Sequence, residues 1–265
     1  MRIVVCVKQV PDTTEVRIDP KTGTLIREGV PTIINPDDLA GLEAALTLKD
    51  KYGVQVVAVS MGPPQAASAL NQALAMGCDE AYLVSDRAFG GADTWATSNT
   101  LAGAIKKIGY DMIFTGRQAI DGDTAQVGPQ IAEILGLPQV TYAQNIQKVE
   151  DENAFIVERQ FEDCYKKIKI KAPGLITALS SMNNARYMTV AGIEEAFSAK
   201  EVVTLTFDDL KDFVDEANIG LKGSPTQVRK SYPKQVKPTG AIHADVSDDQ
   251  AVDLIIAKLK ESYII

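Results

Sequence analysis

The stretch DMIFTGRQAIDGDTAQVGPQ, residues 111–130, shows most directly how the chain folds. Asp111–Thr115 is an apolar run of strand length, and the polar, glycine-containing loop after it leads into a segment with helical apolar spacing that ends at Gly136. Because Pro129 has no amide hydrogen, it fits only the first turn of a helix, so we expect that helix to begin near residues 125–127. The stretch therefore predicts a strand, a loop and a helix in that order.

The same order recurs before this stretch. Apolar runs predict strands, and glycines that follow helical spacing predict helix ends. One helix is expected to start at Asn35-Pro36-Asp37-Asp38, with Asn35 as cap and acids in the first turn, and another at Asp93 or Thr94. Strands alternating with helices indicate an α/β fold with a doubly wound, mostly parallel, Rossmann-like sheet. The expected strands are Arg2–Lys8, Val54–Val59 and Ala81–Val84, and the helix ends are Gly53, Gly77 and Gly109.

Beyond Val140 the pattern changes to alternation, which is typical of strands. Ala154–Phe161 and Lys166–Lys171 flank a short turn and predict an antiparallel hairpin, and Leu175–Leu179 predicts one more core strand. In the second run, Lys167, Lys169 and Lys171 share one face, which favours a solvated face over an anion site.

The tail differs from both preceding parts. Residues 221–240 contain lysines and prolines but no acid and no periodicity, so we expect an extended C-terminal arm. Ser247–Ile265 has the apolar spacing of an amphipathic helix. We therefore expect an α/β domain over residues 1–200, and an arm with a helix that packs on a partner subunit over residues 201–265.

Composition excludes several classes of protein. Among 265 residues, 35 acids outnumber 27 bases, which argues against nucleic acid as the partner. No 18-residue apolar run and no signal-like start are found, so we expect a cytoplasmic protein without membrane insertion. The cysteines are far apart, so no metal site is expected, and His243 is the only histidine, which disfavours a catalytic triad.

Ligands of doubly wound sheets bind beyond the carboxyl ends of the strands. The loop at 115–128 offers two glycines and the amide end of a helix, which suit a phosphate or pyrophosphate. A polar loop that merely caps the helix explains the same residues equally well. The turn Ser60-Met61-Gly62 leaves room for a flat ring, whereas Asn35-Pro36 alone favours ordinary capping.

Several blocks, in this order, resemble the beta subunits of electron-transfer flavoproteins, and the Gln-Ala-Ile-Asp block is specific. They are VKQVPD at 7–12, Asn35-Pro36, AVSMGP at 58–63, ALAMG at 73–77 and GRQAIDGD at 116–123. The resemblance implies an adenine-nucleotide-binding domain and a heterodimer whose alpha subunit carries one FAD. The beta subunit then holds AMP in simple carriers, or a second FAD that takes hydride from NADH in electron-bifurcating members.

Carried over by position, the resemblance assigns cofactor-binding and docking residues. The loop amides would hold phosphate oxygens, with Thr124 and Gln126 as possible side-chain donors, and the segment 184–191 would dock into a dehydrogenase with Val190 as anchor. The cofactor-binding residues are Cys6, Asn35, Asp38, Met61, Gly62, Thr115, Gly116, Gly122, Asp123, Thr124, Ala125, Gln126, Val127 and Gly128, and the docking residues are Arg186, Tyr187 and Val190.

Two stretches favour the bifurcating branch: Thr124–Gln130, and the small residues of Val10–Thr14, where simple carriers often have a bulky aromatic residue. The implied acceptors are an acyl-CoA dehydrogenase-type partner, reached through the alpha-subunit FAD, and ferredoxin or flavodoxin. The alternatives are a simple carrier with structural AMP, and a nucleotide-hydrolysing or nucleotide-sensing protein that uses Lys8 with Asp121 and Asp123.

Overall fold

The computed structural model describes residues 1–12, 31–228 and 240–265. Thr13, Thr14 and residues 229–239 of the expected arm lie outside these ranges. The chain divides into two compact units, Met1–Arg229 and Lys230–Ile265, which are described separately.

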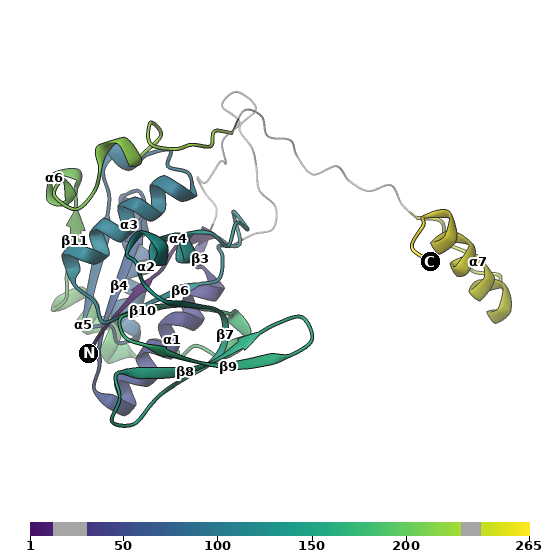
Figure 1. Ribbon diagram of the computed structural model, residues 1–265, viewed down its shortest axis with the longest axis horizontal. Helices are drawn as coiled ribbons and strands as arrows, with labels where there is room; N and C mark the ends of the chain where they lie inside the picture. The colour runs from purple at the N-terminus through teal and green to yellow at the C-terminus, as the bar shows by residue number, and fades with distance from the viewer. Residues whose placement is uncertain (13–30, 229–239) are drawn as a thin grey trace. The chain divides into compact units, whose positions relative to one another are not determined.

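The first unit is built on a nine-stranded sheet in the order β11-β5-β4-β1-β6-β10-β7-β8-β9 (Figure 1). The strands from β11 to β7 run parallel, and β8 and β9 are antiparallel. This arrangement confirms the doubly wound, mostly parallel fold. The strands are β1 (Arg2–Cys6), β4 (Gln55–Met61), β5 (Glu80–Val84), β6 (Met112–Gly116), β7 (Gln139–Lys148), β8 (Ala154–Gln160), β9 (Tyr165–Lys171), β10 (Gly174–Ala178) and β11 (Val202–Leu205).

Helices bury both faces of the sheet, which is why its central strands are apolar throughout. In β1, Ile3 and Val5 face one core and Val4 faces the other. The first core is covered by α1 (Pro36–Tyr52), α2 (Ala67–Met76) and α5 (Val190–Ser198), and the second by α3 (Thr94–Ile108), α4 (Val127–Ile134) and α6 (Phe207–Leu210). The helix α4 begins where Pro129 predicted, and Asp93 caps α3 by accepting from the Ala96 amide. Pro64 opens a short 3-10 turn, and α2 proper begins at Ala67.

The expected hairpin forms as β8 and β9, which extend the sheet at one edge (Figure 1). Two of its lysines are paired on the surface: Lys167 with Glu158 at 3.1 Å and Lys169 with Glu152 at 2.7 Å. The paired and exposed lysines agree with a solvated face.

Several elements were not predicted from the sequence. They are β7, α5, β11 and a small antiparallel pair, β2 (Gln9–Pro11) with β3 (Thr32–Ile34). Because β11 pairs with β5 inside the main sheet, ending the α/β domain at residue 200 was wrong. The domain includes this edge strand and the residues that follow it.

The arm also begins later than expected. Leu221 donates its amide to the Gly90 carbonyl, and the Thr226 amide and hydroxyl both donate to Asp93 at 2.9 and 2.7 Å. Gly220, at φ +59°, permits this turn, since a Cβ there would lie 2.1 Å from the Ala88 carbonyl oxygen. Residues 221–226 are therefore bound to the start of α3 rather than extended.

The second unit contains the expected amphipathic helix, α7 (Asp248–Glu261). Ser247 and Gln250 form a capping box at its start. Val252, Ile255 and Ile256 are exposed in this unit. None of the helices in the described ranges is long and apolar enough to cross a membrane.

Candidate functional site

Three neighbouring parallel strands bring most of the predicted site residues to one edge of the sheet. The strands β4, β1 and β6 end at Met61, Cys6 and Gly116. The start of α1 is hydrogen-bonded to Gly116 and to Lys8, which follows β1. The loop from Arg117 to Gln126, which we call the β6–α4 loop, begins with a bond from the Arg117 amide to the Ala178 carbonyl at the end of β10. The structure thus gathers one site from segments that are far apart in the sequence.

Asp38 joins two strand ends. Its carboxylate accepts from the Lys8 amide at 2.8 Å and from the Gly116 amide at 2.9 Å. Burial raises the pKa of Asp38 to about 7, and hydrogen bonds from Asn35, Lys8 and Gly116 oppose this rise. Asp38 therefore fixes the backbone from which the β6–α4 loop departs.

Asn35 is the N-cap residue of α1, as predicted, but its side chain makes no capping hydrogen bond. Its Nδ2 donates to the Gln118 carbonyl at 2.8 Å and its Oδ1 accepts from the Ile120 amide at 3.0 Å. The residue is fully buried. Asn35 thus holds the first half of the β6–α4 loop, because a loop with satisfied backbone groups keeps one conformation.

Glycines allow backbone and helix to approach closely in this region. At Gly116 a Cβ would lie 2.3 Å from Asp38 Oδ1, and at Gly128 it would lie 2.6 Å from Thr115 Oγ1. Thr115 is itself buried and donates to the Gly116 carbonyl. Gly128 therefore seats α4 on the sheet, a packing role that its position in a phosphate-type motif did not reveal.

Gly122 differs from these two glycines. An added Cβ there meets nothing within 4 Å, so its backbone borders open space. Asp123 and Ala125 have left-handed φ values of 50° and 51°, which turn successive amides within the loop. Positive φ at non-glycine residues is uncommon and clusters at ligand sites. The Gly122 and Asp123 amides donate to the Ala119 carbonyl at 3.2 and 2.9 Å, so the loop amides that can face an anion are those from Thr124 onward, together with the first-turn amides of α4.

The far end of the loop is tied to α3. Gln126 Oε1 accepts from Thr94 Oγ1 at 2.8 Å. This hydrogen bond orients the side-chain amide of Gln126, which was predicted to be a possible donor to the phosphate. The next residue, Trp95, is 37% exposed and its indole N–H contacts Asn218 Oδ1 at 3.4 Å. Thr124 is exposed. The contact between the Thr94 hydroxyl and the Gln126 side-chain amide was not predictable, since α3 and α4 are separated in the sequence.

The charged groups of the site are paired with one another. Lys8 Nζ contacts Asp121 Oδ1 and Oδ2 at 2.6 and 2.9 Å, and Arg117 Nε lies 3.2 Å from Asp37 Oδ2. In the described part of the chain, no group of three or more His, Cys, Asp or Glu side chains is placed to hold a metal ion. The nucleotide-hydrolysing alternative uses Lys8 to bind phosphate. In the structure, Lys8 is instead paired with Asp121 of the loop.

At the ends of β1 and β4, Cys6 and Met61 border the site with uncharged side chains. Burial, with a smaller contribution from Asp38, raises the pKa of the Cys6 thiol to about 12, so the thiol stays protonated at neutral pH. Met61 is half-buried, and the Gly62 amide donates to the Val84 carbonyl. These positions offer an apolar wall rather than a reactive group.

Of the predicted docking residues, Arg186 binds α1 away from the nucleotide loop, and Val190 begins α5. Arg186 donates its amide and its Nε to Glu43 Oε2 at 3.0 and 2.9 Å, and its Nη2 to Asp50 Oδ2 at 2.8 Å. Tyr187 and Val190 are 95% and 84% exposed. Ile193 and Phe197, which sequence reasoning missed, are exposed one and two turns further along α5. Arg186 is thus held by the chain, and the apolar side chains are the available surface.

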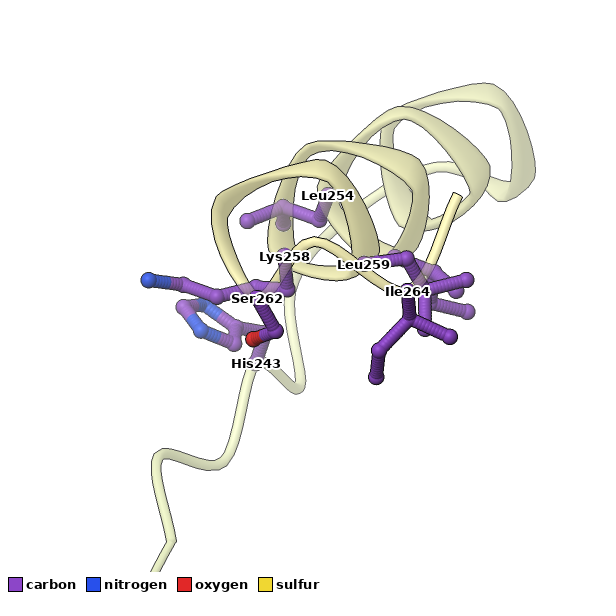
Figure 2. A pocket seen from close by; sticks show the side chains of 7 residues that line it. His243, Leu254, Lys258, Leu259, Ser262 and Ile264 are labelled. Carbon is purple, nitrogen blue, oxygen red and sulfur yellow. The ribbon is translucent and has the colours of Figure 1, made fainter.

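The second unit has a hollow of its own, of about 310 Å³. Figure 2 shows His243, Lys258 and Ser262 near one another, with Leu259 and Ile264 beside them. The lining is mostly aliphatic, and it includes the one histidine of the chain.

Comparison with known proteins identifies the family to which the chain belongs. The model of the "Electron transfer flavoprotein domain" matches residues 22–210. The chain belongs to the electron transfer flavoprotein family. It is 58% identical to the electron transfer flavoprotein subunit beta of Clostridium acetobutylicum, over the whole of both chains. It is 53% identical to the caffeyl-CoA reductase-Etf complex subunit CarD of Acetobacterium woodii and 48% identical to the acryloyl-CoA reductase electron transfer subunit gamma of Anaerotignum propionicum, again over the whole of both chains.

These matches confirm the resemblance to beta subunits of electron transfer flavoproteins. Membership of this family implies association with a flavin or nucleotide cofactor, which carries the redox chemistry while the protein binds and orients it.

Proposed function

We propose that this chain is the beta subunit of an electron-bifurcating electron transfer flavoprotein and binds FAD at the carboxyl edge of its sheet. When bound there, FAD would supply hydride acceptance from NADH and electron transfer to ferredoxin or flavodoxin and to the alpha-subunit FAD. The observation that carries the proposal is the open space beside the Gly122 backbone. Gly122 lies between the part of the β6–α4 loop that Asn35 holds and the start of α4.

The residues present fit an adenine dinucleotide. Loop amides from Thr124 to Gln126 and the start of α4 suit the pyrophosphate, since both attract anions, whereas the Asp123 amide donates to the Ala119 carbonyl. We assign the adenine to the turn at Met61 and Gly62, at the carboxyl end of β4. The chain's own work is therefore to bind and orient the cofactor, while Lys8 and Asp121 hold the loop beside it.

Sequence details favour FAD over AMP. Thr124–Gln130 follows the acidic block, where simple carriers tend to have Asn-Gln-Thr-Gly-Gln, and Val10–Thr14 lacks the bulky aromatic residue often found there. Smaller residues leave more room above the nucleotide, as a flavin requires.

Exposed apolar surfaces support two protein partners. Tyr187, Val190 and Phe197 form a surface for an acyl-CoA dehydrogenase-type partner, in keeping with relatives named for caffeyl-CoA reductase and acryloyl-CoA reductase. The apolar residues of α7, including Ile255 at 60% exposure, suit packing on the alpha subunit.

The test is the cofactor content of the heterodimer purified after co-expression with an alpha subunit. We expect two FAD and no AMP after acid release. Gly122→Val, whose Cβ would meet no atom of the described chain within 4 Å, should lower flavin affinity at least tenfold, about 1.4 kcal/mol, because its methyl groups enter the pyrophosphate contact. Gly240→Val is the matched control, since a Cβ there also meets nothing within 4 Å.

One FAD with one AMP would move the protein to the simple-carrier alternative. Two FAD that are retained in Gly122→Val would show that the β6–α4 loop does not hold the pyrophosphate.

A further inference from the structure

One stripe of α1 holds the chain that leads to the docking residues. Asp37 accepts from the Ser180 amide at 2.8 Å, and the Ala40 carbonyl accepts from Asn183 Nδ2 at 3.0 Å. Glu43 and Asp50 then bind Arg186. Since positions three to four residues apart lie on the same face of a helix, these contacts run along a single side of α1.

Glu43 makes the strongest contact in this stripe. Its two carboxylate oxygens accept from the backbone amide, Nε and Nη2 of Arg186 at 2.9–3.0 Å, and Thr47 Oγ1 donates to Oε1 at 3.1 Å. The residue is 8% exposed. Burial opposes ionisation of Glu43, but the hydrogen bonds from Arg186 outweigh it and hold the pKa below its usual range.

The two residues just after Arg186, Tyr187 and Met188, have no comparable support, whereas Val190 begins α5, which Thr189 caps by accepting from the Gly192 amide. Tyr187 is 95% exposed, and Met188 and Val190 are 40% and 84% exposed. Exposed side chains on an unsupported segment would lose conformational freedom on binding, which weakens association. The geometry at Arg186 removes part of that loss, because a guanidinium held by two carboxylates fixes the backbone at that point.

We infer that Glu43 is a positioning residue for docking: through Arg186 it fixes the segment that presents Tyr187 and Val190 to the dehydrogenase. This inference rests on the proposed function of that segment. Glu43 itself touches neither the partner nor the nucleotide site; it acts by pre-organising the surface. Asp50 assists from the more exposed side of the same guanidinium.

The experiment measures reduction of a purified short-chain acyl-CoA dehydrogenase by the heterodimer, with Glu43→Gln, Asp50→Asn and Arg186→Lys. Gln keeps the size of Glu but loses its charge, and Lys loses the two-pronged contact. We expect KM for the dehydrogenase to rise about tenfold in Glu43→Gln and Arg186→Lys, and less in Asp50→Asn, with kcat and cofactor content unchanged. The double variant Glu43→Gln with Arg186→Lys should cost little more than either change alone, because both act on one contact.

The variant Val190→Asp distinguishes the docking role of the segment from the positioning role of Glu43. If Val190→Asp raises KM while Glu43→Gln and Arg186→Lys leave it unchanged, the positioning role is overturned and the docking assignment stands. If Val190→Asp also leaves KM unchanged, the docking assignment itself fails. A loss of kcat and cofactor in Glu43→Gln without a change in KM shows a structural role only and also overturns the inference. Asp50→Asn, whose side chain is 62% exposed, keeps the test decisive if Glu43→Gln folds poorly.

Discussion

The β6–α4 loop and the docking segment follow neighbouring parallel strands, β6 and β10, and both are held by α1. Asn35 and Asp38 at the start of α1 bind backbone groups of the first, whereas Glu43 and Asp50 further along bind the side chain of Arg186 in the second. The first leaves amide groups at its surface and the second leaves apolar side chains. One helix thus supports a surface for an anion and a surface for a protein, and the difference lies in which groups it buries.

The largest effect is expected from removing the support of the nucleotide side. Asp38→Ala leaves the amides of Lys8 and Gly116 without their acceptor, at a cost of about 1–3 kcal/mol for each buried group. Urea unfolding of the heterodimer should show this loss in the free energy of unfolding, with a loss of bound nucleotide. Asp38→Asn, which keeps one acceptor oxygen, should lose less. Equal stability of Asp38→Ala and wild type would mean that Asp38 does not hold the strand ends together.

A smaller effect is expected on the protein-binding side. Val190→Asp places a charge at an apolar contact, where desolvating an unpaired charge should weaken dehydrogenase binding at least tenfold, about 1.4 kcal/mol. The fold and the nucleotide content should not change, because Val190 is 84% exposed. Val228→Asp is the control, since Val228 is equally exposed, at 85%, outside the segment. Stopped-flow reduction by NADH should proceed normally in both variants. If Val190→Asp lowered NADH reduction as much as dehydrogenase binding, the docking segment and the nucleotide site would not be independent.

The effect of pH should be confined to the nucleotide side. The folded pKa of Asp38, about 7, lies above the ordinary value of 3.8, so the native state holds the proton more tightly. Its contribution to stability is therefore complete below pH 4 and is lost as the pH rises through 7. The stability of wild type should fall relative to Asp38→Asn between pH 4 and 7, as measured by urea unfolding at each pH. A constant difference would show that Asp38 is ionised throughout, and that its hydrogen bonds outweigh its burial.

Much of the nucleotide side was predictable because its signals are local. Buried parallel strands are continuous apolar runs, glycines end the helices, and Pro129 locates the start of α4. The roles of Asn35 and Gly128 were not predictable. Capping and loop-holding need the same Asn, and anion approach and helix packing need the same Gly, so only tertiary contacts distinguish them.

The protein-binding side was harder to predict from the sequence. The strand β7 contains many polar residues, and its alternation is interrupted near Tyr142, where φ is 58° and the register shifts. The edge strand β11 has only four residues, two of them exposed. The helix α5 has an apolar stripe that faces outward, which periodicity cannot distinguish from a stripe that faces a core. Glu43 resembled any helical acid until Arg186 was seen beside it.

Trp95 gives this molecule an optical reporter of its own. It is the only tryptophan of the chain, and its neighbour Thr94 is bonded to the β6–α4 loop through Gln126. Flavins absorb light in the range where indole emits, whereas adenylate does not. Emission from Trp95 should therefore be quenched by energy transfer when the site holds FAD and stay bright when it holds AMP. The difference in fluorescence between wild type and Trp95→Phe isolates this signal within the heterodimer, so nucleotide exchange can be followed in real time without any added dye.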